Sequence, residues 1–175
     1  AVALLTTASY LLFYTPLKLR TSLSTIAGAV PGALPAVIGW AAATNTLSIE
    51  AWVLFGIGFT WQMPHFLAIA WMYRDDYARA GIPLLPVLEP DGRRTGYQAM
   101  LYASALWPVS LLPAVVGLAG LPYSAVAAVL GFLFIGLSVQ FAQERSHATA
   151  RPLFLFSILY LTLLLGALVA NRLWM

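Results

Sequence analysis

The chain contains 175 residues, of which 61% are hydrophobic and only 9% are charged, and its mean hydropathy is +0.85. Soluble domains average about 25% charged residues, so this composition excludes a water-soluble globular domain and indicates an integral membrane protein. The absence of cysteine excludes disulfides, thiolate nucleophiles and cysteine-ligated metal sites. The net charge is +3, and its distribution does not form the basic stripe of a nucleic-acid-binding protein.

Apolar segments of about 20 residues, the length that crosses about 30 Å of hydrocarbon, recur along the whole chain. They predict an all-α fold, a polytopic transmembrane helical bundle with six spans in a single domain over residues 1–175. The first segment is short and has no polar flank, so we expect the chain to begin inside a helix and the domain to be N-terminally truncated. The predicted spans are Ala1–Tyr14, Ile26–Ala43, Ala51–Tyr73, Gln98–Leu118, Tyr123–Gln140 and Pro152–Ala170.

The cationic residues fall in alternate connections between these spans. The first, third and fifth connections hold every lysine and arginine except Arg172, whereas the second and fourth connections hold none. The positive-inside rule therefore predicts that the connections rich in Asp and Arg lie on the cytoplasmic side of the membrane. The cations on that side are Lys18, Arg20, Arg74, Arg79, Arg93, Arg94, Arg145 and Arg151.

Two adjacent carboxylates, Asp75 and Asp76, lie where the third span leaves the membrane. On a continuing helix they point about 100° apart, so one can face the bundle while the other meets water. Carboxylates suit Mg²⁺ that is bound together with phosphate oxygens. The alternative is a solvated helix end in which Asp75 pairs with Arg79 at i,i+4. The spacing alone does not decide between these two interpretations.

Other polar residues suggest a ligand without defining it. Lys18 and Arg20 lie on the same side as the two carboxylates and could bind a diphosphate, although an orientation signal explains them more simply.

The third connection is long, and its apolar centre, Ile82–Leu88, should be ordered against membrane or protein. Gly28 and Gly32 form a GxxxG pair that ordinary helix packing explains.

A histidine and a glutamine lie at mid-membrane depth, where polar groups are costly. Gln62 and His65 are three residues apart and share a helical face. The imidazole could ligate iron, donate a hydrogen bond to a propionate or move a proton, or it could be a hydrogen-bonded packing residue. The second histidine, His147, lies in a connection, which argues against a bis-histidine haem site.

Several segments together resemble the haem O synthase (protohaem IX farnesyltransferase) family of the UbiA superfamily of intramembrane prenyltransferases. Two of these segments, Trp61–Phe66 and Asp76–Val87, are together specific for that family within its superfamily. The segments are Tyr14-Thr-Pro-Leu-Lys18, Gly28-Ala-Val-Pro-Gly-Ala-Leu-Pro35 with Gly39-Trp40, Trp61-Gln-Met-Pro-His-Phe66, Asp76-Tyr-Ala-Arg-Ala-Gly-Ile-Pro-Leu-Leu-Pro-Val87, and Arg151-Pro-Leu-Phe154 with Ser157-Ile-Leu-Tyr-Leu161.

The resemblance implies a nine-helix bundle around a lipid-accessible cavity, of which this chain supplies the last six helices. It implies an enzyme of the bacterial plasma (inner) membrane that transfers a farnesyl group from farnesyl diphosphate to a vinyl group of haem b. The products would be haem O and diphosphate, in haem biosynthesis for terminal oxidases. The Asn/Asp-rich motif that family members carry after their second helix is absent from this sequence.

The resemblance also implies roles for individual residues. Asp76 and Asp75 would ligate Mg²⁺, and together with Lys18 they would act in catalysis. Arg20, Arg74, Arg79 and Tyr77 would contact the diphosphate substrate, while His65 with Gln62 would face the cavity and contact the porphyrin. The farnesyl cation requires a dry aromatic lining, for which Trp61, Phe66, Trp71 and Tyr73 are candidates.

The partners that follow are haem b, farnesyl diphosphate, the lipid bilayer, and haem A synthase or terminal oxidase assembly proteins. Three alternatives remain from the residues themselves. A prenyltransferase of quinone or chlorophyll synthesis would share the diphosphate site but not the His65 segment. A transporter-like bundle would carry polar groups at mid-membrane depth in several helices. A non-enzymatic scaffold would leave the Asp-Arg connection unexplained.

Overall fold

The computed structural model of the chain describes residues 2–174, and all regular elements within that range are helical. Ala1, the first residue of the first predicted span, lies outside the described residues. The elements in chain order are α1 (Val2–Ser9), the π-helical turn η1 (Tyr10–Tyr14), α2 (Thr15–Leu17), α3 (Ser24–Thr44), α4 (Ile49–Met72), α5 (Arg74–Arg79), α6 (Leu85–Leu88), α7 (Arg93–Val115), α8 (Leu121–Glu144) and α9 (His147–Trp174).

Five helices in the described range, α3, α4, α7, α8 and α9, are long and apolar enough to cross a bilayer. They confirm the last five predicted spans as helices. The first span is a shorter apolar helical stretch, Val2–Leu17, which η1 interrupts. The span predicted from Gln98 begins earlier, at Arg93, because the polar first turn of α7 continues the helix beyond its apolar part.

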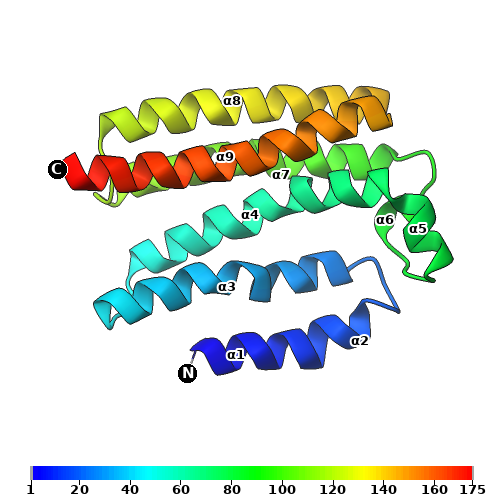
Figure 1. The fold of residues 1–175 in the computed structure, drawn as a ribbon, viewed down its shortest axis with the longest axis horizontal. Coiled ribbons are helices and arrows are strands. Elements are labelled where there is room, and N and C mark those ends of the chain that lie inside the picture. The colour runs from blue at the N-terminus through cyan, green and yellow to red at the C-terminus, as the bar shows by residue number, and fades with distance from the viewer. Residues whose placement is uncertain (1, 175) are drawn as a thin grey trace.

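Figure 1 shows the long helices running side by side, with α4 between α3 on one side and α7 and α9 on the other. Both termini lie at one end of the bundle, and α5 and α6 lie at the opposite end. Consecutive long helices therefore run in opposite directions. This arrangement brings the cation-bearing connections after α2, α4 and α8 to the same end, as the charge pattern predicts.

The main core lies among α4, α7, α8 and α9 and contains the fully buried aromatic residues Tyr123, Phe134, Phe141 and Tyr160. Both tyrosine hydroxyls have partners at Ser110. Tyr123 donates to the Ser110 carbonyl oxygen at 2.8 Å, and the Tyr160 hydroxyl lies 2.7 Å from Ser110 Oγ. Paired hydroxyls satisfy the polar ends of large apolar side chains, so this network fixes α7 against α8 and α9 at low cost.

The third connection is ordered, as its apolar centre predicts. It contains α5 and α6, and Pro86 of α6 is buried. Gly92, in the left-handed region at φ +68°, ends the connection and begins α7 while lying directly against the Trp71 ring. A side chain at this position would meet both a strained backbone conformation and the indole, so the return of the chain to the bundle requires glycine here.

Close helix contact at Gly96 gives a stability prediction. A Cβ at Gly96 of α7 would lie 2.7 Å from Ala142 Cα of α8, whereas a Cβ at Gly136 would have no neighbour within 4 Å. We expect Gly96→Ala to destabilise the folded protein by about 1–3 kcal/mol through overpacking. Gly136→Ala is the matched control and should not lower the midpoint of thermal unfolding in detergent. Equal midpoints for the two variants would contradict the α7–α8 packing.

Candidate functional site

A cavity of about 710 Å³ lies between the first helical stretch, α3, α4 and the α5–α6 connection. Much of its lining is apolar and includes Pro31, Phe66 and Leu67, and the connection contributes Ile82 and Leu84. Toward the end of the bundle that carries α5 and α6, Lys18 and Tyr77 also line it. The cavity is therefore amphiphilic, with an apolar interior and a cation near one end.

The first helical stretch lines this cavity with hydroxyl-bearing residues, Thr6, Thr7, Tyr10 and Tyr14. In η1 the Thr15 N–H donates to the Tyr10 carbonyl oxygen, which is a π-type bond. Pro16 follows directly and has no N–H, so a regular α-helical bond is lost at this turn. The Tyr10 and Tyr14 rings lie 4.9 Å apart. Single π-helical turns are frequent at functional sites, and this one places two phenol rings at the cavity.

Gly28 of α3 lets Tyr14 lie against the helix backbone. A Cβ at Gly28 would lie 2.7 Å from Tyr14 Cδ2. The GxxxG pair predicted to serve helix packing thus also shapes the cavity, because Gly28 and Gly32 both line it. At Gly32 the Gln62 side-chain oxygen occupies the space that a Cβ would need.

The predicted cationic residues separate into two groups. Lys18 is half-buried and lines the cavity, whereas Arg20 is exposed and does not. Arg74 lies over the Trp71 ring with its guanidinium carbon 4.4 Å from the ring centroid. Arg79 pairs with Asp76 on the surface of α5. Lys18 is therefore the cation that the structure places at the cavity.

Both predicted carboxylates are exposed on α5. The side chain of Asp75 is 85% exposed and lies 4.0 Å from Arg74 Nε, and that of Asp76 is 60% exposed. The Asp75–Arg79 pair, which was one of the two alternatives left open by the sequence, does not form, since Arg79 pairs with Asp76 at i,i+3 instead. Both spacings bring side chains together on a helix, so sequence spacing alone could not distinguish them. Neither carboxylate faces the bundle, although Tyr77, the next residue, lines the cavity.

Gln62 joins α4 to α3 beside the cavity. Its Nε2 donates to the Ala29 carbonyl oxygen at 2.7 Å, and the side chain is 4% exposed. The residue lines the main cavity and also a second cavity of about 200 Å³ between α3, α4 and α9. Because the Gln62 amide nitrogen already donates this hydrogen bond to α3, the main role of the side chain is to link the two helices that form the cavity wall.

His65 does not line the cavity beside Gln62 as predicted. Its Nδ1 lies 2.7 Å from Ser157 Oγ of α9. A separation of three residues rotates a side chain by about 60° around the helix. Because α4 lies between α3 and α9, that rotation is enough to place Gln62 against α3 and His65 against α9.

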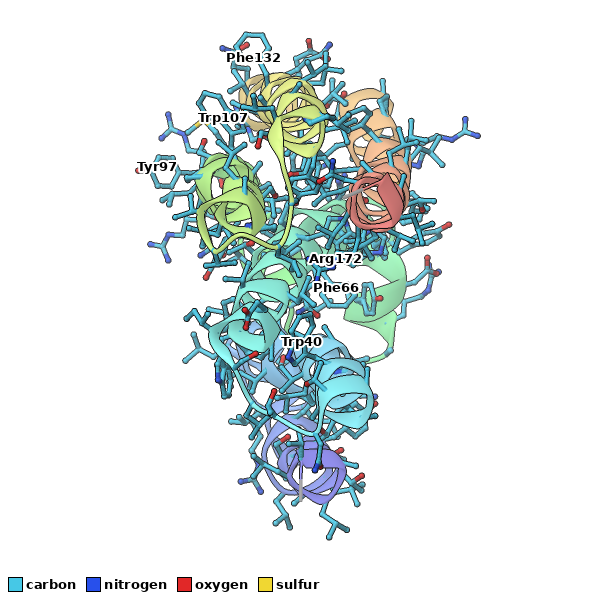
Figure 2. The ribbon with its side chains drawn as sticks, turned by 90° about the vertical axis from the view of Figure 1, so that its left-hand side faces the viewer. Trp40, Phe66, Tyr97, Trp107, Phe132 and Arg172 are labelled. Atoms are coloured by element: carbon cyan, nitrogen blue, oxygen red, sulfur yellow. The ribbon has the colours of Figure 1, made fainter. Side chains whose placement is uncertain are left out.

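Of the aromatic residues predicted to line the cavity, Phe66 alone does so in the described part of the chain. Figure 2 shows Phe66 projecting from the bundle on the side of α9, and its ring centroid lies 5.6 Å from that of His65. Trp61 lines the smaller cavity, Trp71 is buried in the core, and Tyr73 is exposed. Phe66 therefore lines the main cavity and also lies next to His65.

Sequence reasoning missed the contribution of Thr6, Thr7 and Tyr10 and the contact of Ser157 with His65. The hydroxyls of Thr6 and Thr7 are internally paired, since they donate to the Val2 and Ala3 carbonyl oxygens at 2.9 and 3.1 Å. Nothing in an apolar segment with scattered threonines indicates which side of the helix meets a cavity. The contact of Ser157 with His65 depends on the packing of α9 on α4, which no local pattern shows.

Together, the fold and the cavity define a polytopic α-helical membrane protein with an amphiphilic cavity that Lys18 lines. Residues 1–170 match the model of the UbiA prenyltransferase family, and the chain belongs to that family. Membership of this family favours the prenyltransferase interpretation over the transporter-like and scaffold alternatives.

The chain is similar to curated relatives named Protoheme IX farnesyltransferase. That of Solibacter usitatus is 52% identical over 95% of this chain and 57% of the relative. That of Koribacter versatilis is 44% identical over 98% and 58%, and that of Salinibacter ruber is 46% identical over 93% and 57%. This chain thus spans somewhat more than half the length of these relatives.

A solved structure supports the fold independently. It comes from work titled "Structural and mechanistic insights into the biosynthesis of Digeranylgeranylglyceryl phosphate synthase in membranes". It superposes with a TM-score of 0.86 over 99% of this chain and 61% of the other chain, at 16% identity. The shared fold therefore covers nearly the whole of this chain.

Proposed function

We propose that this chain is part of an enzyme that transfers a farnesyl group from farnesyl diphosphate to a vinyl group of haem b and, with addition of water, gives haem O and diphosphate. The observation that carries the proposal is the amphiphilic cavity with Lys18 at its polar end, in a chain 52% identical to a protein named Protoheme IX farnesyltransferase. The apolar interior suits an isoprenoid chain, and the cation suits its diphosphate.

The reaction breaks an allylic C–O bond and leaves negative charge on the diphosphate. In this proposal Lys18, half-buried at the cavity, stabilises that charge, because a cation partly shielded from water acts more strongly than one in open solvent. Tyr77 lines the same cavity, and its hydroxyl can donate a further hydrogen bond. The rings of Tyr10, Tyr14 and Phe66 line the cavity and would limit the contact of the farnesyl cation with water until the vinyl group attacks. That attack forms a C–C bond and leaves a cation on the former vinyl group, to which a water molecule then adds its oxygen while releasing a proton to solvent.

The carboxylates of α5 fit part of a Mg²⁺ site. In the range 2–174, no group of three or more His, Asp and Glu side chains lies close enough to hold a metal ion. Mg²⁺ is commonly held by one or two carboxylates together with substrate phosphates, so Asp76 and Asp75 suffice for one side of such a site. When bound, Mg²⁺ supplies positive charge to the departing diphosphate. We infer that further carboxylates come from a part of the enzyme outside these 175 residues.

The surface pair between Asp76 and Arg79 is compatible with this role. Exposed ion pairs contribute only about 0–1 kcal/mol, so Arg79 can exchange the carboxylate for diphosphate at little cost. Arg74 is less available, because its guanidinium stacks on Trp71. We therefore rank Lys18 first and Arg79 second as diphosphate contacts, with Arg20 and Arg74 behind them.

Haem b is proposed to approach α4 from the side of His65. Phe66 lines the cavity, and its ring centroid lies 5.6 Å from that of His65, so a porphyrin near His65 and an isoprenoid in the cavity would be neighbours. A quinone or chlorophyll prenyltransferase is the second candidate, because the same cavity would accept its isoprenoid diphosphate. The half-buried histidine and the names of the relatives favour haem.

The site is proposed to face the cytoplasm of a bacterial plasma membrane. Cysteines introduced at Arg93, at the end of the bundle that carries α5 and α6, and at Thr46, at the opposite end, should be labelled from opposite sides. A membrane-impermeant reagent applied to intact cells should reach Thr46→Cys and not Arg93→Cys. Labelling of both from the same side would contradict the topology.

Product formation tests the proposal. The protein expressed from its complete coding sequence, supplied with haem b, farnesyl diphosphate and Mg²⁺, should form haem O that chromatography separates from haem b. Residues 1–175 alone should form none, because a diphosphate with about three negative charges needs carboxylates from more than one loop. Product from residues 1–175 alone would show that our account of the metal site is wrong.

A further inference from the structure

Ser157 of α9 makes two hydrogen bonds whose directions constrain the proton on His65. Its Oγ lies 2.5 Å from the Phe154 carbonyl oxygen and 2.7 Å from His65 Nδ1. Ser157 is fully buried, whereas His65 is half-buried. The contact with His65 joins Trp61–Phe66 to Arg151–Leu161, two of the segments that resemble the haem O synthase family.

The serine has only one proton to donate. A carbonyl oxygen carries no proton, so a separation of 2.5 Å between it and Oγ requires the serine hydroxyl to donate to Phe154. Oγ is then an acceptor toward the imidazole, and Nδ1 must carry the proton. A neutral histidine protonated at Nδ1 has a lone pair at Nε2. In the part of the chain that the structure describes, Nε2 has no hydrogen-bond partner.

The ring is also held in orientation by its neighbours. The Trp61 ring stacks on it with centroids 4.9 Å apart and planes inclined by 23°, and the Phe154 ring centroid lies at 5.0 Å. Trp61 is itself fixed to α9, because its Nε1 donates to the Ser157 carbonyl oxygen at 2.6 Å. Ser157 thus contacts both members of the stacked pair, His65 through its side chain and Trp61 through its backbone.

We propose that Ser157 is a positioning residue that holds His65 in the Nδ1-protonated form and so presents the Nε2 lone pair to the iron of haem b. This inference rests on the proposed function and selects among the roles that the sequence leaves open. In this form Nε2 cannot donate to a propionate carboxylate, but it can ligate iron. Histidines that ligate metals generally donate their other ring N–H to a neighbouring acceptor, and loss of that acceptor lowers metal affinity about 10- to 100-fold.

The test is a titration of the purified complete protein with haem b and, separately, with metal-free protoporphyrin IX. Ser157→Ala should weaken haem b binding about tenfold or more and change the Soret band of the bound haem. Its affinity for the metal-free porphyrin and for farnesyl diphosphate should be unchanged. Ser157→Thr, which keeps the hydroxyl, should restore most of the haem affinity.

Ser138→Ala is the matched control. Ser138 is also fully buried, and its Oγ donates to the carbonyl oxygen three residues earlier, Ile135, at 2.8 Å, but it contacts no histidine. This variant should bind haem b normally. In a protein that already carries His65→Ala, Ser157→Ala should cause less than a further twofold loss, because a positioning residue acts through its partner.

The outcomes separate the two proposals. Equal losses of haem and metal-free porphyrin in Ser157→Ala, or additive losses with His65→Ala, would show that Ser157 contributes only packing and would overturn the inference. Normal haem binding by Ser157→Ala would overturn it as well, while leaving the proposed function intact. Failure of the unsubstituted protein to bind haem b would overturn both.

Discussion

Replacing Asp76 with alanine should lower haem O formation by about 10²-fold or more while the protein still inserts into the membrane. Loss of one metal ligand removes several kcal/mol of stabilisation from the charge that develops on the diphosphate, and about 1.4 kcal/mol corresponds to a factor of ten in rate. The side chain is 60% exposed and pairs only with Arg79, so its removal should not destabilise the fold. The rate is measured with the complete protein at saturating Mg²⁺ and both substrates.

Two further variants show whether the effect is specific to the metal site. Asp75→Ala should be milder, because neighbouring residues on a helix cannot face one ion equally well. Glu144→Ala is the control, since Glu144 ends α8 at the same end of the bundle and is exposed. Near-normal turnover by Asp76→Ala at saturating Mg²⁺ would exclude a metal role for this carboxylate.

Replacing Lys18 with methionine should weaken the binding of farnesyl diphosphate about 10- to 100-fold. Hydrogen bonds to charged groups contribute about 1.5–3 kcal/mol, and methionine keeps most of the side-chain volume without the charge. Lys18 is half-buried at the cavity, where its charge is screened less by water than that of a surface residue. Equilibrium binding of farnesyl diphosphate to the complete protein measures the change.

Arg20 provides the control within the same connection. Arg20 is exposed and does not line the cavity, so Arg20→Met should change the affinity less than threefold, as expected for a screened surface charge. Haem b binding should be unaffected in both variants. If both variants lost affinity equally, the two cations would attract the diphosphate only through their summed charge, and the assignment of Lys18 to the cavity would be wrong.

The sequence predicts the membrane architecture well because its physical causes are local. Twenty apolar residues must form a helix in a bilayer, since no water is present to satisfy the backbone. The five long spans and the alternation of their connections follow from that rule and from the positions of lysine and arginine. The ordered third connection was predictable from Ile82–Leu88, whose apolar side chains need a surface to cover.

The candidate site was predictable only in part, because it depends on which helices are neighbours. The resemblance drew attention to Lys18 and Tyr77, and the structure places both at the cavity. Gln62 and His65 share a helical face in sequence, yet they contact different helices, because α4 lies between α3 and α9. The π-helical turn at Tyr10–Tyr14 depends on the response of the backbone to Pro16, and no hydropathy pattern distinguishes it from a regular helix.

The identity of the acceptor is the central claim, and competition between acceptors tests it most directly. The purified complete protein is incubated with Mg²⁺, farnesyl diphosphate and equal amounts of haem b and an aromatic quinone precursor, and the products are identified by mass spectrometry. The account predicts that the farnesyl group appears on haem, and that His65→Ala lowers this product without weakening the binding of farnesyl diphosphate. Farnesylation of the quinone precursor in preference to haem b would contradict the account.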